Sequence, residues 1–129
     1  MDKKKMILCD TNIFIDYFHE EGQIVRELDY LGFNRLAMSV VSVAEIYFGM
    51  RKRETSDTRT LISKFNHLHI DKETSKLFVQ MMLGYKDMGI AIPDALIAAT
   101  ALANNMVLYT HNRKDFNFID NLQLYNPKF

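Results

Sequence analysis

The chain has 129 residues, of which 48% are hydrophobic and 25% are charged, and its formal net charge at pH 7 is zero. This composition is enough for one domain with a buried core and excludes a wholly disordered chain. The zero net charge excludes a global basic field, so any contact with nucleic acid must be local. Cys9 is the only cysteine, which excludes an intrachain disulfide.

The start of the chain is relevant to the location of the protein. Three lysines at residues 3–5 precede an apolar run that stops at Asp10. This run is too short for the core of a secretory signal, and no later apolar stretch is long enough to span a membrane. We therefore expect a soluble cytoplasmic protein, with a single domain over residues 1–129 and no membrane contact.

Short apolar runs alternate with helical patterns along the chain. We expect a strand at residues 6–9, helices at 12–18 and 24–31, a strand at 36–38, and helices within 39–50 and 58–65. The second half continues with a strand at 67–70, helices at 72–88 and 94–104, and strands at 106–109 and 122–124. Strands separated by helices favour a parallel sheet of about five strands covered on both faces, which is an α/β/α fold.

Four acidic residues follow a predicted strand or begin a predicted helix: Asp10, Glu45, Asp94 and Asp115. The carboxyl ends of parallel strands meet at one edge of a sheet, where open α/β sheets bind ligands. Carboxylates gathered there repel one another unless a cation neutralises them, and oxygen donors favour magnesium or manganese over zinc. Such a site can activate water for an in-line displacement at a phosphodiester.

Asp10 and Glu45 also have structural alternatives. Asp10 can cap the helix that follows it, although Thr11 is available for that role. Ser42 and Glu45 have the spacing of a capping box, which is the favoured interpretation of that window alone. The substitution Glu45→Gln separates the two roles, because it keeps the box geometry and removes the charge that a metal ion needs.

Structural alternatives exist for the other two acids as well. Asp94 follows Pro93 in the first turn of a predicted helix, where an acid also favours the helix dipole. Asp115 can form a turn with its own backbone. The helix that begins at Asp94 is rich in alanine, so it can press closely on the sheet and hold its first turn rigidly, as a metal ligand requires.

Four segments around these acids resemble the motifs of PIN-domain ribonucleases. The segments lie at residues 8–18, 39–49, 94–101 and 108–116. They occur in the order of the family and span nearly the whole chain, whereas the stretch at residues 52–88 carries no match. The length and single-domain layout are similar to the VapC toxins of prokaryotic toxin–antitoxin pairs.

The resemblance implies a three-layer PIN-like fold and a magnesium-dependent endoribonuclease, with manganese as an alternative ion. It also implies a homodimer, an RNA substrate, and inhibition by a small antitoxin protein. By the same resemblance, the catalytic and metal-binding residues are Asp10, Glu45, Asp94 and Asp115. The supporting polar residues are Thr11, Asn12, Thr110 and Asn112.

Other functions remain as alternatives. A housekeeping PIN nuclease of RNA processing would act without an antitoxin. A phosphorylation-dependent receiver domain has a similar length but needs paired acids after its first strand, and here Asp10 is followed by Thr11. A non-catalytic binding module would keep the fold and lack both metal binding and cleavage.

Several further residues lie near the predicted site or exceed the needs of a small core. His111 lies in the fourth motif and can approach a substrate, whereas Asp16 is expected to be structural. The basic clusters at residues 51–53 and 113–114 can touch phosphate, with a solvated surface as the default. We expect some aromatic residues to face a second subunit or an antitoxin segment. These aromatic residues are Phe14, Tyr17, Phe18, Tyr47 and Phe48.

Overall fold

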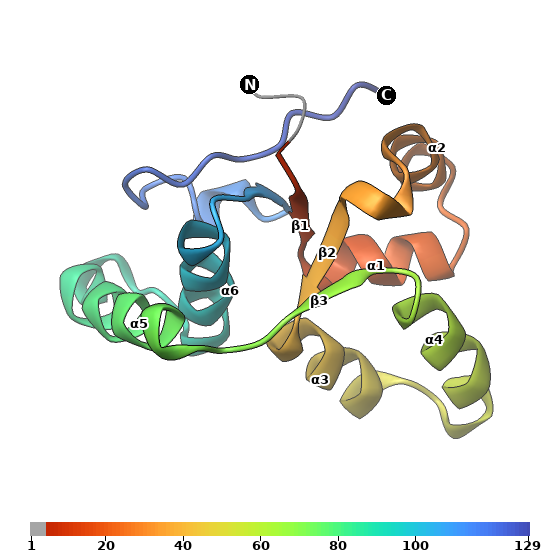
Figure 1. The fold of residues 1–129 in the computed structure, drawn as a ribbon, viewed down its shortest axis with the longest axis horizontal. Helices are drawn as coiled ribbons and strands as arrows, with labels where there is room; N and C mark the ends of the chain where they lie inside the picture. The colour runs from red at the N-terminus through yellow and green to blue at the C-terminus, as the bar shows by residue number, and fades with distance from the viewer. Residues whose placement is uncertain (1–4) are drawn as a thin grey trace.

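Four parallel strands run through the middle of the molecule in the order β3-β2-β1-β4 (Figure 1). They are β1 Ile7–Cys9, β2 Leu36–Ser39, β3 Asn66–Leu68 and β4 Val107–Tyr109. The arrangement is that of a computed structural model, which describes residues 5–129. Lys3 and Lys4, part of the basic start of the chain, lie outside the described residues. The strand expected at residues 122–124 is reduced to one bridge between Leu108 and Leu124, so the described chain has four strands.

Six α-helices cover the sheet. They are α1 Thr11–Phe18, α2 Gly22–Leu31, α3 Val40–Gly49, α4 Thr55–Ile62, α5 Lys72–Gly84 and α6 Ile92–Ala103. Short 3-10 turns lie between or after these elements at η1 Phe33–Arg35, η2 Lys52–Glu54, η3 Lys86–Met88 and η4 Arg113–Asp115. In the described residues, no helix combines the length and apolar character needed to cross a membrane.

Two predicted helices differ from the observed ones at their ends. The helix expected at residues 72–88 ends at Gly84, and a separate turn continues to Gly89, whose φ of 73° is the left-handed conformation that glycine adopts without strain. The helix expected at residues 58–65 begins at Thr55 and ends at Ile62. Phe65 lies beyond it and is buried in the core just before β3 begins.

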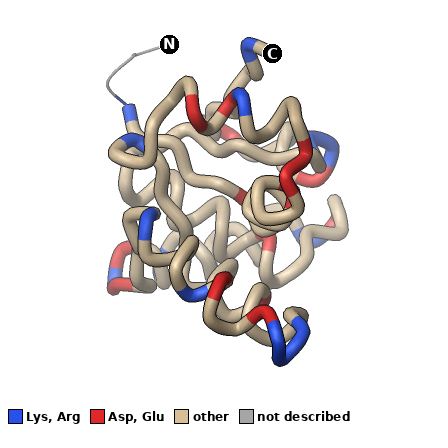
Figure 2. Tube along the Cα trace, turned by 90° about the vertical axis from the view of Figure 1, so that its right-hand side faces the viewer, with Lys and Arg blue, Asp and Glu red and all other residues tan. Residues whose placement is uncertain are grey.

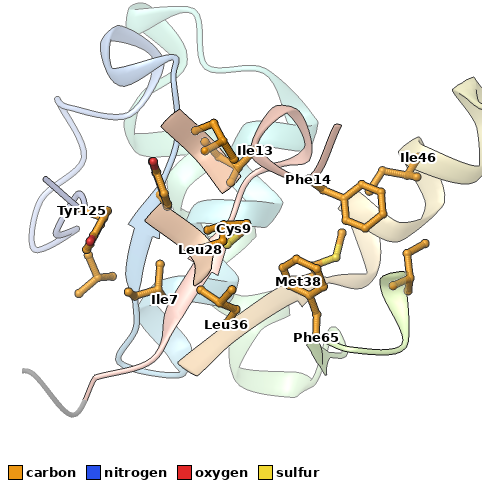
Figure 3. Close-up of a cluster of buried hydrophobic side chains, with 14 residues drawn as sticks. Ile7, Cys9, Ile13, Phe14, Leu28, Leu36, Met38, Ile46, Phe65 and Tyr125 are labelled. Atoms are coloured by element: carbon orange, nitrogen blue, oxygen red, sulfur yellow. The ribbon is translucent and has the colours of Figure 1, made fainter. Parts of the chain in front are cut away.

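The sheet separates two hydrophobic cores. Ile7 and Cys9 of β1 face α1 to α4, in the core that Figure 3 draws around Phe14 and Leu28. Leu8, between them, faces α5 and α6 on the other side. Because alternate residues of a strand point to opposite faces, a strand buried on both faces is apolar throughout. The predicted three-layer α/β/α arrangement is thereby confirmed, with helices on both sides of the sheet in Figure 1.

The edge at which the strands end brings three helix starts together. Helices α1 and α3 begin directly after β1 and β2, and α6 begins at the same end of the sheet in Figure 1. Helix α6 packs closely on the sheet through its small side chains, which are fully buried. These are Ala95, Ala98, Ala99 and Ala101. The close packing holds the first turn of α6, and with it Asp94, in a defined position beside the strand ends.

Candidate active site

Asp10 lies directly after β1 and is the most buried of the four predicted acids, at 7% exposure. Its Oδ1 accepts a hydrogen bond of 2.8 Å from the backbone N–H of Thr11, which makes Asp10 the N-cap of α1. The expectation that Thr11 caps this helix is wrong, because Thr11 already lies in its first turn while Asp10 keeps extended backbone angles. Capping and a functional role are therefore compatible, since one carboxylate has two oxygens with two lone pairs each.

The second oxygen of Asp10 is held from the neighbouring strand. The hydroxyl of Thr110, directly after β4, donates a hydrogen bond of 2.8 Å to Oδ2 of Asp10. Thr110 is itself buried, and its Oγ accepts a hydrogen bond of 3.0 Å from the backbone N–H of Asn112. The carboxylate of Asp10 is therefore oriented by two donors from two different strand ends.

Glu45 lies on α3 and faces α1. Its Oε1 accepts a hydrogen bond of 2.7 Å from the Thr11 hydroxyl, which lies 3.0 Å from Oγ of Ser42. The predicted capping box of Ser42 and Glu45 is wrong, because α3 begins at Val40 and its N-cap is Ser39. The Ser39 hydroxyl accepts a hydrogen bond of 3.1 Å from the backbone N–H of Ser42. The carboxylate of Glu45 therefore has no part in capping the N-terminus of α3.

Asp94 links the four acids electrostatically. It lies half-buried in the first turn of α6, and its pKa is raised from 3.8 to about 6. Burial is the largest cause, and the charges of Asp10, Asp115 and Glu45 follow in that order. Because all three charges act on Asp94, the four carboxylates share one region, although they come from four separate segments of the chain.

The remaining predicted residues are placed less tightly. Asp115 ends the η4 turn and is exposed. Asn12 is exposed on the first turn of α1, and Asn112 contributes its backbone N–H to Thr110. Two of the four predicted supporting residues donate a side-chain hydrogen bond to a carboxylate of the site: Thr11 donates to Glu45, and Thr110 donates to Asp10.

The donor set fits a hard divalent cation, because all its members are carboxylate or hydroxyl oxygens. Over residues 5–129, no three His, Cys, Asp or Glu side chains are grouped tightly enough to hold a metal ion as they stand. Binding an ion therefore requires the carboxylates to move closer together. Glu45 and Asp115 are exposed, and Glu45 gives up one hydrogen bond from Thr11 if it moves, whereas Asp10 is buried and held by two.

Two further acidic residues have contacts that sequence reasoning missed. Asp16, expected to be structural only, makes a hydrogen-bond contact of 2.8 Å with Nε2 of His111, beside Thr110. Glu27 is 1% exposed and accepts hydrogen bonds from the Tyr125 hydroxyl and from two backbone N–H groups near the end of the chain. Glu27 shares the apolar face of α2 with Ile24 and Leu28, and that position was a signal available in the sequence.

Charges of both signs are interspersed over the part of the molecule in view. In the view of Figure 2, basic and acidic segments alternate along the trace and neither sign forms a continuous block. A polyanion would therefore be attracted only by local groups of cations, and the carboxylate site itself repels it unless positive charge is supplied there.

Comparison with known proteins gives consistent matches over most of the chain. The profile of the PIN domain matches residues 7–121. The chain is 31% identical over 117 residues to Ribonuclease VapC1 of Methanocaldococcus jannaschii, which covers 88% of this chain and 81% of that protein. A chain of a toxin–antitoxin complex from Klebsiella pneumoniae is 31% identical with a TM-score of 0.80, covering 94% of this chain and 97% of that one. A chain of VapBC2 from Rickettsia felis, bound to a DNA fragment from its promoter, has a TM-score of 0.83 at 26% identity, with 94% and 98% covered.

Proposed function

Since this chain belongs to the PIN-domain family, we propose that it is a metal-dependent endoribonuclease and the toxin of a toxin–antitoxin pair. Its substrate is then RNA, and its place of action is the cytoplasm. The receiver-domain alternative is excluded by the family match over residues 7–121. The housekeeping nuclease and the non-catalytic module are outcomes of the experiments below.

The observation that carries this proposal is the gathering of four carboxylates at one edge of the sheet. The raised pKa of Asp94 records their mutual repulsion, after the effect of burial. A fold gains no stability from such repulsion, so a functional role accounts for it better than a structural one. Nucleases of this family generally depend on a divalent metal ion, and a cation is what this cluster of charges would bind.

We assign the following roles to the residues of the site. Asp10 and Asp94 hold the cation directly, and Glu45 and Asp115 complete its surroundings directly or through water. When bound, a divalent cation lowers the pKa of water and offsets negative charge on the phosphodiester. Thr110 and the backbone N–H of Thr11 orient Asp10, so that its carboxylate is ready before substrate arrives.

Cleavage of RNA by purified protein, free of any antitoxin, tests the proposal. Wild type should cleave single-stranded RNA only when a divalent cation is added, and Asp94→Asn should lower the rate about a hundredfold or more. Asp87→Asn is the matched control, because it makes the same change on the exposed η3 turn. Wild type that binds no divalent metal and cleaves no RNA would identify the non-catalytic module.

Magnesium is the ion that we propose for the site, with manganese as a substitute. Both are hard cations that accept carboxylate and water oxygens. Calorimetric titration of the wild-type protein with each ion, repeated with Asp10→Asn, distinguishes them. Magnesium binding that is lost in Asp10→Asn supports the assignment of magnesium. Binding of manganese alone would identify manganese as the ion of the site.

We further propose that the antitoxin segment occupies a groove between α1, α3 and α4. The groove has a volume of about 130 Å³, and its walls include Phe14, Phe18 and Met50. Glu45 also lines it, so a segment lying there reaches the carboxylate site and can block it. This placement explains how one binding event could inhibit the nuclease.

A substitution at the groove tests this placement. Gly49 lies in the groove wall, and a Cβ atom added there meets no atom within 4 Å beyond its neighbouring residues and its own helix backbone. Gly49→Tyr should therefore fold normally and weaken inhibition by the antitoxin co-expressed from the neighbouring gene. Gly22→Tyr, at an equally open glycine on α2, is the control. Absence of any inhibitory neighbour would favour the housekeeping nuclease.

A second copy of the chain is the partner that we propose for the outer face of α5. Val79 is 64% exposed and Leu83 is 71% exposed, and their spacing of four residues puts them on one side of the helix. Replacing both with lysine should convert a dimer to a monomer in sedimentation. Phe48 on α3 is 94% exposed and is the alternative dimer contact. A monomer produced by Phe48→Lys alone would show that the dimer interface lies at α3 and not at α5.

A further inference from the structure

A cavity of about 220 Å³ adjoins the carboxylate site on the side of β4. Its walls include Gln23, Thr110, His111, Arg113, Pro127 and Phe129. Thr110 belongs to both regions, because its hydroxyl donates to Asp10. The cavity and the carboxylate of Asp10 are therefore separated by the side chain of a single residue.

The polar side chains of the cavity are held in place by other parts of the chain. The guanidinium of Arg113 donates hydrogen bonds to the backbone oxygen of Tyr125 at 3.0 Å and to Oδ1 of Asn126 at 3.4 Å. His111 is paired with Asp16 at 2.8 Å. These contacts fix two cationic or protonatable groups at the rim, so their positions need no reordering when a ligand binds.

The aromatic wall of the cavity is anchored from within. Oε1 of the buried Glu27 accepts the backbone N–H groups of Lys128 at 2.7 Å and Phe129 at 2.9 Å. The Phe129 ring contacts the edge of Tyr30 at a centroid distance of 5.8 Å and is 48% exposed. In Figure 1 the end of the chain accordingly lies close to α2. The Arg26 guanidinium lies over one side of the ring, 5.9 Å from its centroid, so the aromatic ring is held at the cavity wall and stays partly exposed.

We propose that this cavity binds the base of an RNA nucleotide that neighbours the phosphodiester at the carboxylates, an inference that rests on the proposed function. Single-stranded RNA is recognised by stacking of bases on aromatic rings and by hydrogen bonds to their polar edges. Phe129 supplies the ring, and Gln23 supplies an amide that can both donate and accept. The volume is below the roughly 300–1,000 Å³ of sites for drug-sized ligands, which suits one base.

A binding measurement without catalysis tests this inference separately from the nuclease function. The probe is a short fluorescent single-stranded RNA, titrated in EDTA with protein that carries Asp94→Asn throughout, so that no cleavage occurs and one repelling carboxylate is removed. Phe129→Leu removes the ring and keeps the backbone N–H that Glu27 holds. Gln23→Trp fills the mouth of the cavity from an exposed position, and Gln23→Ala is its matched control for loss of the amide alone. Thermal unfolding checks that each variant is folded.

The expected result is RNA binding weakened about tenfold in Phe129→Leu and in Gln23→Trp, and less in Gln23→Ala. In the cleavage assay the same variants should raise KM with kcat nearly unchanged, and lose any nucleotide preference beside the cleaved bond. Unchanged binding in both Phe129→Leu and Gln23→Trp would overturn the inference, whether or not wild type cleaves RNA. Failure of wild type to cleave would count against the proposed function alone, because the binding titration needs no cleavage.

Discussion

Thr110 and Asp10 are 100 residues apart in the chain, and a hydrogen bond of 2.8 Å joins the hydroxyl of Thr110 to Oδ2 of Asp10. The contact exists because β1 and β4 are adjacent parallel strands, with Cys9 opposite Tyr109 in the register. The next residue of each strand therefore emerges at the same edge of the sheet. Both residues are buried, so the bond is shielded from water and orients the carboxylate firmly.

Thr110→Val should lower RNA cleavage roughly 10- to 100-fold, because it removes the donor to Asp10 with little change in volume. Steady-state kinetics at saturating metal ion measures the effect. Thr110→Ser, which keeps the hydroxyl, should retain most of the activity. Equal losses in Val and Ser variants would mean that packing of the methyl group matters more than the hydrogen bond.

Asp94→Asn should stabilise the metal-free protein at neutral pH while abolishing activity. The pKa of Asp94 is about 6 in the folded protein against an ordinary value of 3.8, so the folded state binds the proton more tightly. The ionised carboxylate therefore costs stability above about pH 6, and this cost disappears as the pH falls toward 4. Thermal unfolding of both proteins across this range should show a Tm gap of a few degrees that closes in acid.

Addition of a divalent cation should reverse this order at neutral pH. The cation offsets the repulsion that Asp94 feels from Asp10, Asp115 and Glu45, so the Tm of wild type should rise more than that of Asp94→Asn. Equal shifts in the two proteins would indicate that the cation binds elsewhere.

Glu45→Gln and Ser39→Ala should have opposite consequences. Ser39 is the observed N-cap of α3, so its replacement by alanine should cost about 1 kcal/mol of unfolding free energy. Glu45 caps nothing, and its exposed carboxylate can be neutralised with little effect on stability. Urea unfolding and RNA cleavage, measured on both variants, should therefore give a destabilised active protein and a stable inactive one. A large loss of stability in Glu45→Gln would instead mean that the hydrogen bond from Thr11 to Glu45 supports the fold.

Glu27→Leu should destabilise the protein by about 3 kcal/mol, because one hydroxyl and two backbone N–H groups lose a charged acceptor. Glu27→Gln should cost only about 1 kcal/mol, since its oxygen can still accept both N–H groups and its amide can donate to Tyr125. Urea unfolding measures both changes. Hydrogen exchange at Lys128 and Phe129 should accelerate most in the leucine variant, and unchanged exchange there would show that Glu27 does not anchor the end of the chain.

The layers of the fold were predictable from local pattern. The run at residues 6–9 is apolar at every position, which is the pattern of a strand covered on both faces, and all residues of β1 are buried. The alanine-rich face of α6 likewise predicted close packing, and Ala98 is fully buried in the core that also holds Leu8 and Leu108 of the sheet. The helix predicted over residues 72–88 is longer than the observed one, because the apolar pattern continues past Gly84 although the α-helical backbone ends there.

The sequence by itself predicted that Asp10, Glu45 and Asp94 meet at one edge, because strands that alternate with helices form a parallel sheet whose carboxyl ends lie together. Their binding of a metal ion stays a prediction. Only the tertiary structure decided which donor each carboxylate accepts: Asp10 caps α1, Glu45 accepts from Thr11, and Glu27 anchors the end of the chain. The physical reason is that a hydrogen bond depends on distances below about 3.2 Å between groups far apart in the chain, whereas burial depends on a periodicity that local sequence carries.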